Sequence, residues 1–154
     1  MKTKLTLILI LSIFKVFSQD IEKIEKTDTV YIYFKVDKNL HQIYHKEKTS
    51  NKEINYYNYF FSFPNGQLSF QFAHYTKLFP NVVNKKKSFL KKNKSIILDY
   101  DFIEKTGSLR IAELIGYGGF AKKIVYVIDD AETTFFKITL RQVGIISPRN
   151  PGIE

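Results

Sequence analysis

Alternating apolar and polar residues predict a strand near the start of the chain. Residues 29–36 place Val, Ile and Phe at every second position, a two-residue period typical of a strand with one buried face. Asp37-Lys38-Asn39 then predicts a turn. Residues 40–47 alternate less regularly, and we expect them to form a strand that returns beside the first.

The strongest local signal is a hairpin between residues 56 and 75. Two runs rich in aromatic residues flank Pro64-Asn65-Gly66-Gln67, and Asn-Gly between such runs is a frequent hairpin turn. The alternation assigns these side chains to a buried face: Tyr57, Tyr59, Phe61, Phe63, Leu68, Phe70 and Phe72. The opposite face would carry Tyr56, Asn58, Phe60, Ser69, Gln71 and Ala73.

The apolar period lengthens in the middle of the chain, as it does in helices. Ser88 is expected to cap a short helix over residues 89–94, and Asp99 a second helix over residues 100–105. The apolar residues around Asp99 also alternate, so a strand remains open there.

A third helix is predicted over residues 108–115. Its apolar side would be formed by Leu109, Ala112 and Ile115, and Gly116 would end it.

Residues 122–143 predict a second hairpin around the turn-forming sequence Asp129-Asp130-Ala131-Glu132. One face of this hairpin is assigned to Ile124, Tyr126, Ile128, Phe136, Ile138 and Leu140. Residues 144–154, which contain two prolines, are expected to form a C-terminal tail.

Strands at both ends of the chain, with short helices between them, predict an α+β fold. We expect an antiparallel sheet of four to six strands, built around the hairpins at 56–75 and 122–143. Short helices from residues 86–116 would pack on one face of that sheet. Residues 19–143 would then form a single α+β domain.

The first 18 residues have the three parts of a secretory signal peptide. Lys2 and Lys4 give a positive head, residues 5–14 are nearly all apolar, and cleavage is expected after Ser18. About ten apolar residues rise only about 15 Å as a helix, half of a bilayer core, which argues against a membrane anchor. We therefore predict a signal peptide over residues 1–18 and a soluble periplasmic or secreted protein without a lipid anchor.

Composition removes several classes of site. The chain has no Cys, which excludes disulfides, thiolate metal ligands, Cys nucleophiles and a lipid-modified cysteine. At 44 % hydrophobic and 16 % aromatic residues, it is too apolar for a disordered tail. The formal net charge is +9, yet only three of the 24 basic residues are Arg. Since Arg is the residue expected where phosphates are recognised, the charge is weak evidence for nucleic acid binding.

Six lysines within ten residues form the main candidate binding site. They are Lys85, Lys86, Lys87, Lys91, Lys92 and Lys94. In one helix, Lys87, Lys91 and Lys94 would share a face that could meet a polyanion: nucleic acid, an anionic lipid or an acidic envelope polysaccharide. Export makes nucleic acid the least expected of these. The alternative is a solvated lysine-rich surface without a ligand.

The histidines give little support to metal or catalytic chemistry. His41 and His45 have the spacing of a metal pair on a helix, but in the predicted strand they would lie about 13 Å apart. His74 would be a general base in a small exported hydrolase if a carboxylate such as Asp99 lay beside it.

Paired acids and outward aromatic residues have simpler explanations. The pairs Asp99/Asp101 and Asp129/Asp130 would suit glycoside hydrolysis only across a cleft, and capping and turn formation account for them. The aromatic side chains Tyr31, Tyr33, Tyr56 and Phe60 would offer a stacking platform for a sugar or a protein, or a second layer of core beneath the helices.

These observations favour a small exported protein with a non-enzymatic binding or accessory role in a bacterial cell envelope. We expect an envelope protein or polysaccharide as its partner, and neither a metal nor a cofactor. Two alternatives stay open: a small exported hydrolase that uses His74 with a carboxylate, and a polyanion-binding module that uses Lys85 to Lys94.

Overall fold

The computed structural model describes residues 19–36, 42–48, 54–64, 66–75, 82–116 and 123–146, with the backbone alone for residues 42–48, 54–57, 73–75 and 146. The predicted signal peptide, the glycines that follow Gly116 and residues 147–154 lie outside these ranges. Of the helices that it describes, none is long and apolar enough to cross a bilayer.

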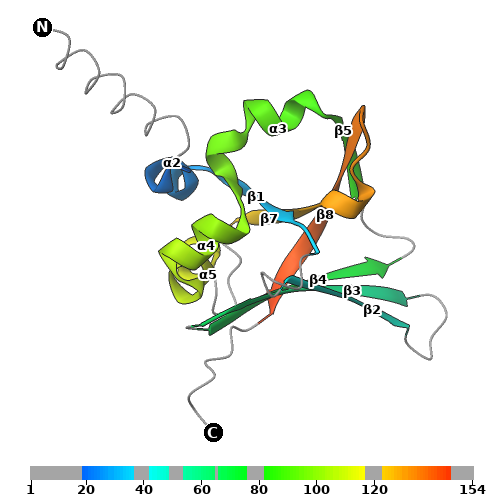
Figure 1. Ribbon diagram of the computed structural model, residues 1–154, viewed down its shortest axis with the longest axis horizontal. Coiled ribbons are helices and arrows are strands. Elements are labelled where there is room, and N and C mark those ends of the chain that lie inside the picture. Colours follow the sequence, from blue (N-terminus) through cyan, green and yellow to red (C-terminus); the bar gives the residue numbers. More distant parts are fainter. Residues whose placement is uncertain are drawn as a thin grey trace, which may run out of the picture.

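The described residues form an eight-stranded, strongly curled sheet flanked by short helices, which confirms the α+β class (Figure 1). The strands are β1 (Thr29–Phe34), β2 (Gln42–Lys48), β3 (Ile54–Phe63), β4 (Gly66–Tyr75), β5 (Val82–Lys86), β6 (Ile97–Leu98), β7 (Ile124–Asp129) and β8 (Lys137–Ile146). Their order is β2-β3-β4-β8-β7-β1-β6, and β5 also pairs with β8. The predicted antiparallel sheet of four to six strands is wrong in detail, because β1 pairs in parallel with both β6 and β7.

The position of β1 corrects the predicted pairing of the first two strands. β1 lies inside the sheet, and β2 lies at the edge beside β3. One face of β1 is fully buried at Val30, Ile32 and Phe34, and the other face is half-buried at Tyr31 and Tyr33. A strand that is apolar on both faces belongs inside a sheet, whereas the polar sequence of β2 suits an edge.

The hairpin predicted between residues 56 and 75 is confirmed. β3 and β4 pair antiparallel, and Phe63 faces Gly66 across a two-residue connection. Gly66 has a φ of 144°, in the region that favours glycine. The face assigned to the core is buried at Tyr59, Phe61, Leu68, Phe70 and Phe72. The opposite face is less exposed than expected, since Asn58 and Ser69 are also buried.

The second predicted hairpin is also confirmed, with different boundaries. β7 and β8 pair antiparallel, but β8 begins only at Lys137. Phe136, assigned to the buried face, is therefore outside the strand and 78 % exposed, and Ile124 is 45 % exposed. β8 continues to Ile146, and its last three residues, which the sequence analysis assigned to a tail, pair with β4.

β8 joins the two halves of the sheet. It pairs with β7 along one side, and with β5 and then β4 along the other. The half that contains β2, β3 and β4 folds back against the half that contains β1 and β7 (Figure 1). Phe34 on β1 consequently packs edge-on against Tyr59 and Phe61 on β3, with ring centroids 4.9 and 5.4 Å apart.

Four short α-helices and two 3₁₀ turns complete the described fold. They are α2 (Ile21–Lys26), α3 (Ser88–Lys92), η2 (Lys94–Ile96), α4 (Tyr100–Thr106), α5 (Ser108–Ile115) and η3 (Asp130–Glu132). Asp99 caps α4 through the Phe102 amide, as predicted, and Gly116 ends α5 at a φ of 104°.

Two details of the helix predictions are wrong. Ser88 does not cap α3, because it is already the first helical residue. Ala112 and Ile115 are buried on α5 as predicted, but Leu109 is 52 % exposed, and Ile111 and Leu114 are buried in its place.

The helices cover two faces of the sheet rather than one. α4 and α5 contribute Tyr100, Ile103 and Ile111 to the main core between the two halves of the sheet. Phe89 and Leu90 of α3 pack on a second, smaller cluster around Ile97, Ile128, Ile138 and Leu140. Because β1 and β7 are apolar on both faces, each face needs its own cover.

Candidate functional site

The six lysines selected from the sequence lie on three consecutive elements. Lys85 and Lys86 end β5, Lys87 precedes α3, Lys91 and Lys92 end α3, and Lys94 begins η2. All six are exposed. We refer to these six residues as the lysine ridge.

The lysine ridge is not the single helix that its spacing suggested. Residues 82–86 are extended and pair with β8, so the helical stretch starts only at Ser88. The amide and the side chain of Asn93 both bond the Phe89 carbonyl, which ends α3 before Lys94. Because Phe89 and Leu90 pack inward on the second cluster, the lysines on either side of them are left at the surface.

Five of the six ridge lysines have no carboxylate partner among the described residues. These five are Lys85, Lys86, Lys87, Lys91 and Lys92. The register places Lys86 directly opposite the exposed Lys137 on β8, and like charges in that position repel. By contrast, Arg110 and Arg141 both have carboxylate partners.

A pocket of about 400 Å³ lies beneath part of the ridge. It opens between α3, η2 and the carboxyl ends of β1 and β6. Its lining is Gln19, Tyr33, Leu90, Lys91, Lys94, Ile97 and Asp99. The lining thus combines apolar side chains with two lysines and one carboxylate. Asp99 already accepts the Phe102 amide as the cap of α4, so its carboxylate is held by the fold.

A polar cluster gathers where β7 ends and η3 begins. The Tyr33 hydroxyl donates a short hydrogen bond to Asp130, and burial followed by this bond raises the pKa of Tyr33. Asp129 is 4 % exposed and accepts the Ala131 amide at 3.0 Å. Burial raises the pKa of Asp129 above its ordinary value, although the bond from Ala131 opposes this. The Asp129 side chain thus forms part of the turn, as its sequence predicted, whereas the Asp130 side chain joins the turn to β1.

Arg141 is the charged group that sequence analysis did not single out. Its guanidinium donates to Glu132 at 2.5 Å and to the Tyr59 hydroxyl at 3.3 Å, and it lies 5.6 Å from the centre of the Phe72 ring. Burial would lower the pKa of Arg141, but the hydrogen bond and charge of Glu132 raise it above the ordinary arginine value. Through these contacts Arg141 joins β8 to η3 and β3, so its role is to stabilise the packing of these elements.

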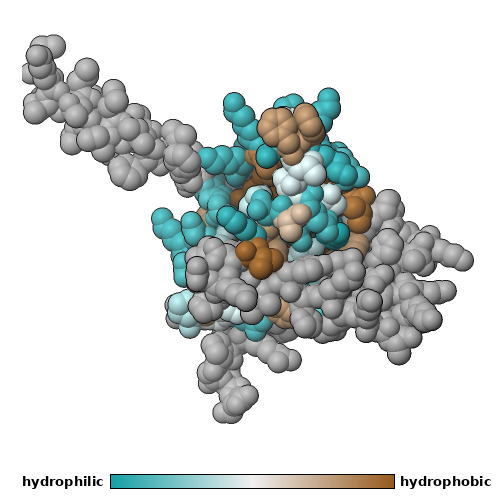
Figure 2. Space-filling model, turned by 45° about the vertical axis from the view of Figure 1, so that its right-hand side comes forward, coloured by the Kyte–Doolittle hydropathy of each residue, from teal (hydrophilic) through white to brown (hydrophobic). Residues whose placement is uncertain are grey.

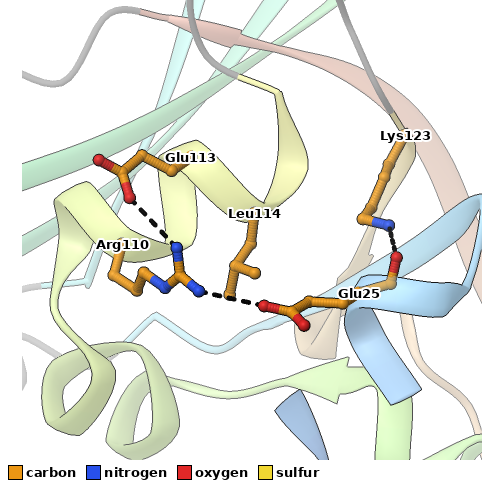
Figure 3. A pocket seen from close by; sticks show the side chains of 5 residues that line it. All are labelled: Glu25, Arg110, Glu113, Leu114 and Lys123. Carbon is orange, nitrogen blue, oxygen red and sulfur yellow. Dashed lines mark hydrogen bonds and ion pairs between the residues drawn. The ribbon is translucent and has the colours of Figure 1, made fainter. Parts of the chain in front are cut away.

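The pocket drawn in Figure 3, of about 460 Å³, has its charged groups already paired. Arg110 on α5 donates to Glu25 at 3.0 Å and to Glu113 at 3.4 Å. The Lys123 ammonium group donates to the Glu25 carbonyl at 2.9 Å and to the Thr27 carbonyl at 2.6 Å, at the carboxyl end of α2. A cation at the carboxyl end of a helix stabilises that helix. These contacts join α2 to α5 and to Lys123, the residue that precedes β7.

The structure leaves the histidine hypotheses untested. His41 lies outside the described residues. His45 on β2 pairs with Asn58, and His74 on β4 pairs with Asn55, but the side chains of both histidines are outside the description. The part of the chain that is described contains no group of three His, Asp or Glu residues that could hold a metal ion.

The outward aromatic residues of β1 do not form an open platform. Tyr31 packs edge-on against Phe89 of α3 at 4.9 Å and stacks with Tyr126 of β7 at 5.9 Å. Tyr31 and Tyr33 therefore belong to the second cluster under α3, which is the core alternative drawn from the sequence.

The sequence analysis also missed an exposed aromatic pair. It assigned Phe136 to the buried face of a hairpin, yet Phe135 and Phe136 are 79 % and 78 % exposed. Two adjacent aromatic residues break a two-residue period, and that break is the signal that could have revealed them.

Comparison with known protein families, curated proteins and solved structures found no match to this chain.

Proposed function

We propose that the protein is a non-enzymatic binding module of the cell envelope, and that its lysine ridge holds a polyanion. The observation that carries the proposal is the lack of a described carboxylate partner for five of the six ridge lysines. Several cations on neighbouring elements make a continuous surface that attracts an extended anion more strongly than it attracts a small one.

Relief of repulsion supports the same proposal. The register opposes Lys86 to Lys137, a like-charge pair that costs free energy in the unbound protein. An anion between the two ammonium groups would remove that cost. Each exposed lysine adds only about 0.2–1 kcal/mol, so useful affinity requires several contacts at once.

The polar cluster at the end of β7 contributes contacts to the fold. Its titratable groups, Tyr33, Asp129 and Asp130, each make a hydrogen bond within the described residues. The hydrolase alternative depends on His74, whose side chain lies outside the described residues, so it stays a prediction.

The binding proposal is tested with a charge-matched pair of variants. Lys87→Gln/Lys91→Gln/Lys92→Gln removes three ridge charges, and Lys23→Gln/Lys26→Gln/Lys105→Gln removes three exposed charges from α2 and α4. Retention on immobilised heparin is measured against salt concentration. We expect the ridge variant to elute at clearly lower salt, with a salt slope reduced by about two to three, and the control to change little. If both variants lose heparin retention equally, binding does not depend on the lysine ridge in particular, and the proposal is contradicted.

The export half of the proposal has a separate test. The intact mass of a C-terminally tagged protein, recovered from the envelope and culture fluid of its host, gives the first residue. A chain that begins at Gln19 supports export, whereas a chain that keeps residues 1–18 contradicts it.

A further inference from the structure

An exposed aromatic tip stands next to the lysine ridge. The segment from Thr133 to Phe136 connects η3 to β8, and we refer to it as the hairpin tip. Its two phenylalanines are 79 % and 78 % exposed, while the other exposed large apolar residues of the described chain range from 37 % to 52 %. Figure 2 shows a small hydrophobic patch, bordered by hydrophilic side chains, at the top of the described surface.

Hydrogen bonds hold the hairpin tip in this position. The Thr133 amide donates to the Asp130 carbonyl at 3.0 Å. The Thr134 amide donates to the Lys137 carbonyl at 2.8 Å, and the Lys137 amide donates to the Thr134 hydroxyl at 3.1 Å. These hydrogen bonds fix the conformation of the tip. The two phenylalanines stay exposed there, so the fold lacks the stabilisation that their burial would contribute.

The same segment is tied directly to the ridge. The Lys87 amide donates to the Phe136 carbonyl at 3.1 Å, and Lys86 pairs with Lys137 across β5 and β8. The exposed apolar pair is therefore bordered by lysines. Of the acids of η3, Glu132 is neutralised by its ion pair with Arg141, and Asp130 accepts a hydrogen bond from the Tyr33 hydroxyl.

We propose that the hairpin tip inserts Phe135 and Phe136 into the surface of an anionic lipid bilayer, while Lys86, Lys87 and Lys137 contact the headgroups. This rests on the proposed function and names its polyanion as the headgroup layer of a membrane. Aromatic side chains enter the boundary between headgroups and acyl chains, and neighbouring lysines gain from the negative surface potential.

Two other occupants fit the tip less well. The rings meet at 87°, so they give no flat platform on which a sugar could stack, and a polysaccharide has no apolar phase to receive them. Two phenylalanines bury about 300–500 Å² between them, against about 800 Å² on each side of a standard protein interface. A bilayer needs only a small apolar insertion that charge attraction supports.

Vesicle binding tests the inference, with the protein and its variants in the form recovered from the host. Phe135→Ser/Phe136→Ser is compared with Leu109→Ser/Val36→Ser, which changes two exposed apolar residues elsewhere. On vesicles of phosphatidylcholine with phosphatidylglycerol, we expect the tip variant to bind at least about tenfold more weakly than the wild type. The control should bind as the wild type does, and neither variant should lose heparin retention.

The outcomes separate the two proposals. If the wild type binds heparin but not anionic vesicles, membrane insertion is refuted and the polyanion is a soluble one such as a polysaccharide. If the tip variant binds anionic vesicles as well as the wild type does, insertion is likewise refuted, and the lysines alone hold the protein on the membrane surface. If the ridge variant keeps full heparin retention, the proposed function itself fails. Vesicles of phosphatidylcholine alone should bind neither the wild type nor any variant, because their surface has no net negative charge to attract the lysines.

A spectroscopic probe decides between insertion and adsorption. The chain contains no Trp, so Phe136→Trp introduces a single indole at the tip. We expect its emission to shift to the blue when anionic vesicles are added, and a quencher attached to the acyl chains to reduce it. Binding without a shift and without quenching would mean adsorption by charge alone, and would overturn the insertion.

Discussion

Replacement of Arg141 by Met tests whether the charged cluster inside the curled sheet stabilises the fold. The Arg141 side chain is 11 % exposed and contacts Glu132, Tyr59 and the ring of Phe72. Met preserves much of the apolar stem but removes the charge and the donors.

The contacts set the expected magnitude. The charge-assisted bond to Glu132 is worth about 1.5–3 kcal/mol, and the contact with the Phe72 ring about 0.5–1 kcal/mol. Relief of the buried charge offsets part of this loss. Because the Glu132 side chain is 34 % exposed, its carboxylate can regain water after the change. We therefore expect Arg141→Met to cost about 2 kcal/mol, which is a fall in Tm of about 6–8 °C for a chain of this size.

A double-mutant cycle of Arg141→Met with Glu132→Gln measures the interaction free energy between Arg141 and Glu132. Urea unfolding followed by circular dichroism gives the free energy of unfolding of each variant. The double variant should lose less than the sum of the two single losses, with a coupling of about 1–2 kcal/mol. Arg110→Met is the control, since Arg110 is 52 % exposed and should cost about 1 kcal/mol or less. Additive losses, or an Arg141→Met cost no larger than that of Arg110→Met, would refute the reasoning.

Three further changes test single contacts. Burial raises the pKa of Asp129, so the native state favours the neutral acid and loses stability as pH rises above about 3.9 towards the raised value. Asp129→Asn keeps an acceptor for the Ala131 amide, and its Tm should be at least that of the wild type at pH 7, with the difference shrinking towards pH 4. Asp99→Ala removes the cap of α4 and should cost about 1 kcal/mol in urea unfolding, whereas Asp99→Asn should cost much less. Lys123→Met removes two donors from the carboxyl end of α2 and should also cost about 1 kcal/mol, with hydrogen exchange increased at Thr27.

Local signals predicted local structure well. The Asn-Gly dipeptide marked the β3–β4 hairpin, Asp99 the start of α4, and Gly116 the end of α5. Each depends on backbone geometry or on a hydrogen bond within a few residues, and these do not require knowledge of the rest of the fold.

The same local signals could not predict which distant strands pair with each other. β1 pairs in parallel with β7, whose residues lie more than 90 positions later in the chain. The two-residue period reports which side chains share a face, but it does not report which strand lies alongside. Tyr31 and Tyr33 were the available hint, because a strand with aromatic residues on its second face is suited to the interior of a sheet.

The curl of the sheet explains why the sequence did not predict that Arg141 is buried. Along β8, Lys137, Thr139 and Arg141 occupy alternate positions, the pattern of a solvent face. Lys137 is exposed as that pattern suggests, but Arg141 packs against Tyr59 and Phe72 of the opposing half of the sheet. Alternation identifies a face, and only the tertiary fold decides what covers it.

The lysine ridge and the hairpin tip differ from the charged groups that hold the fold together. Arg110, Arg141 and Lys123 contribute contacts to the fold, whereas Phe135 and Phe136 remain exposed to water and Lys86 repels Lys137. Removal of the Lys86 side chain or of a tip phenylalanine should consequently leave the free energy of unfolding unchanged or raise it slightly. Such a result would support the proposal that these exposed groups meet an anionic partner outside the fold, because the fold itself would not depend on them.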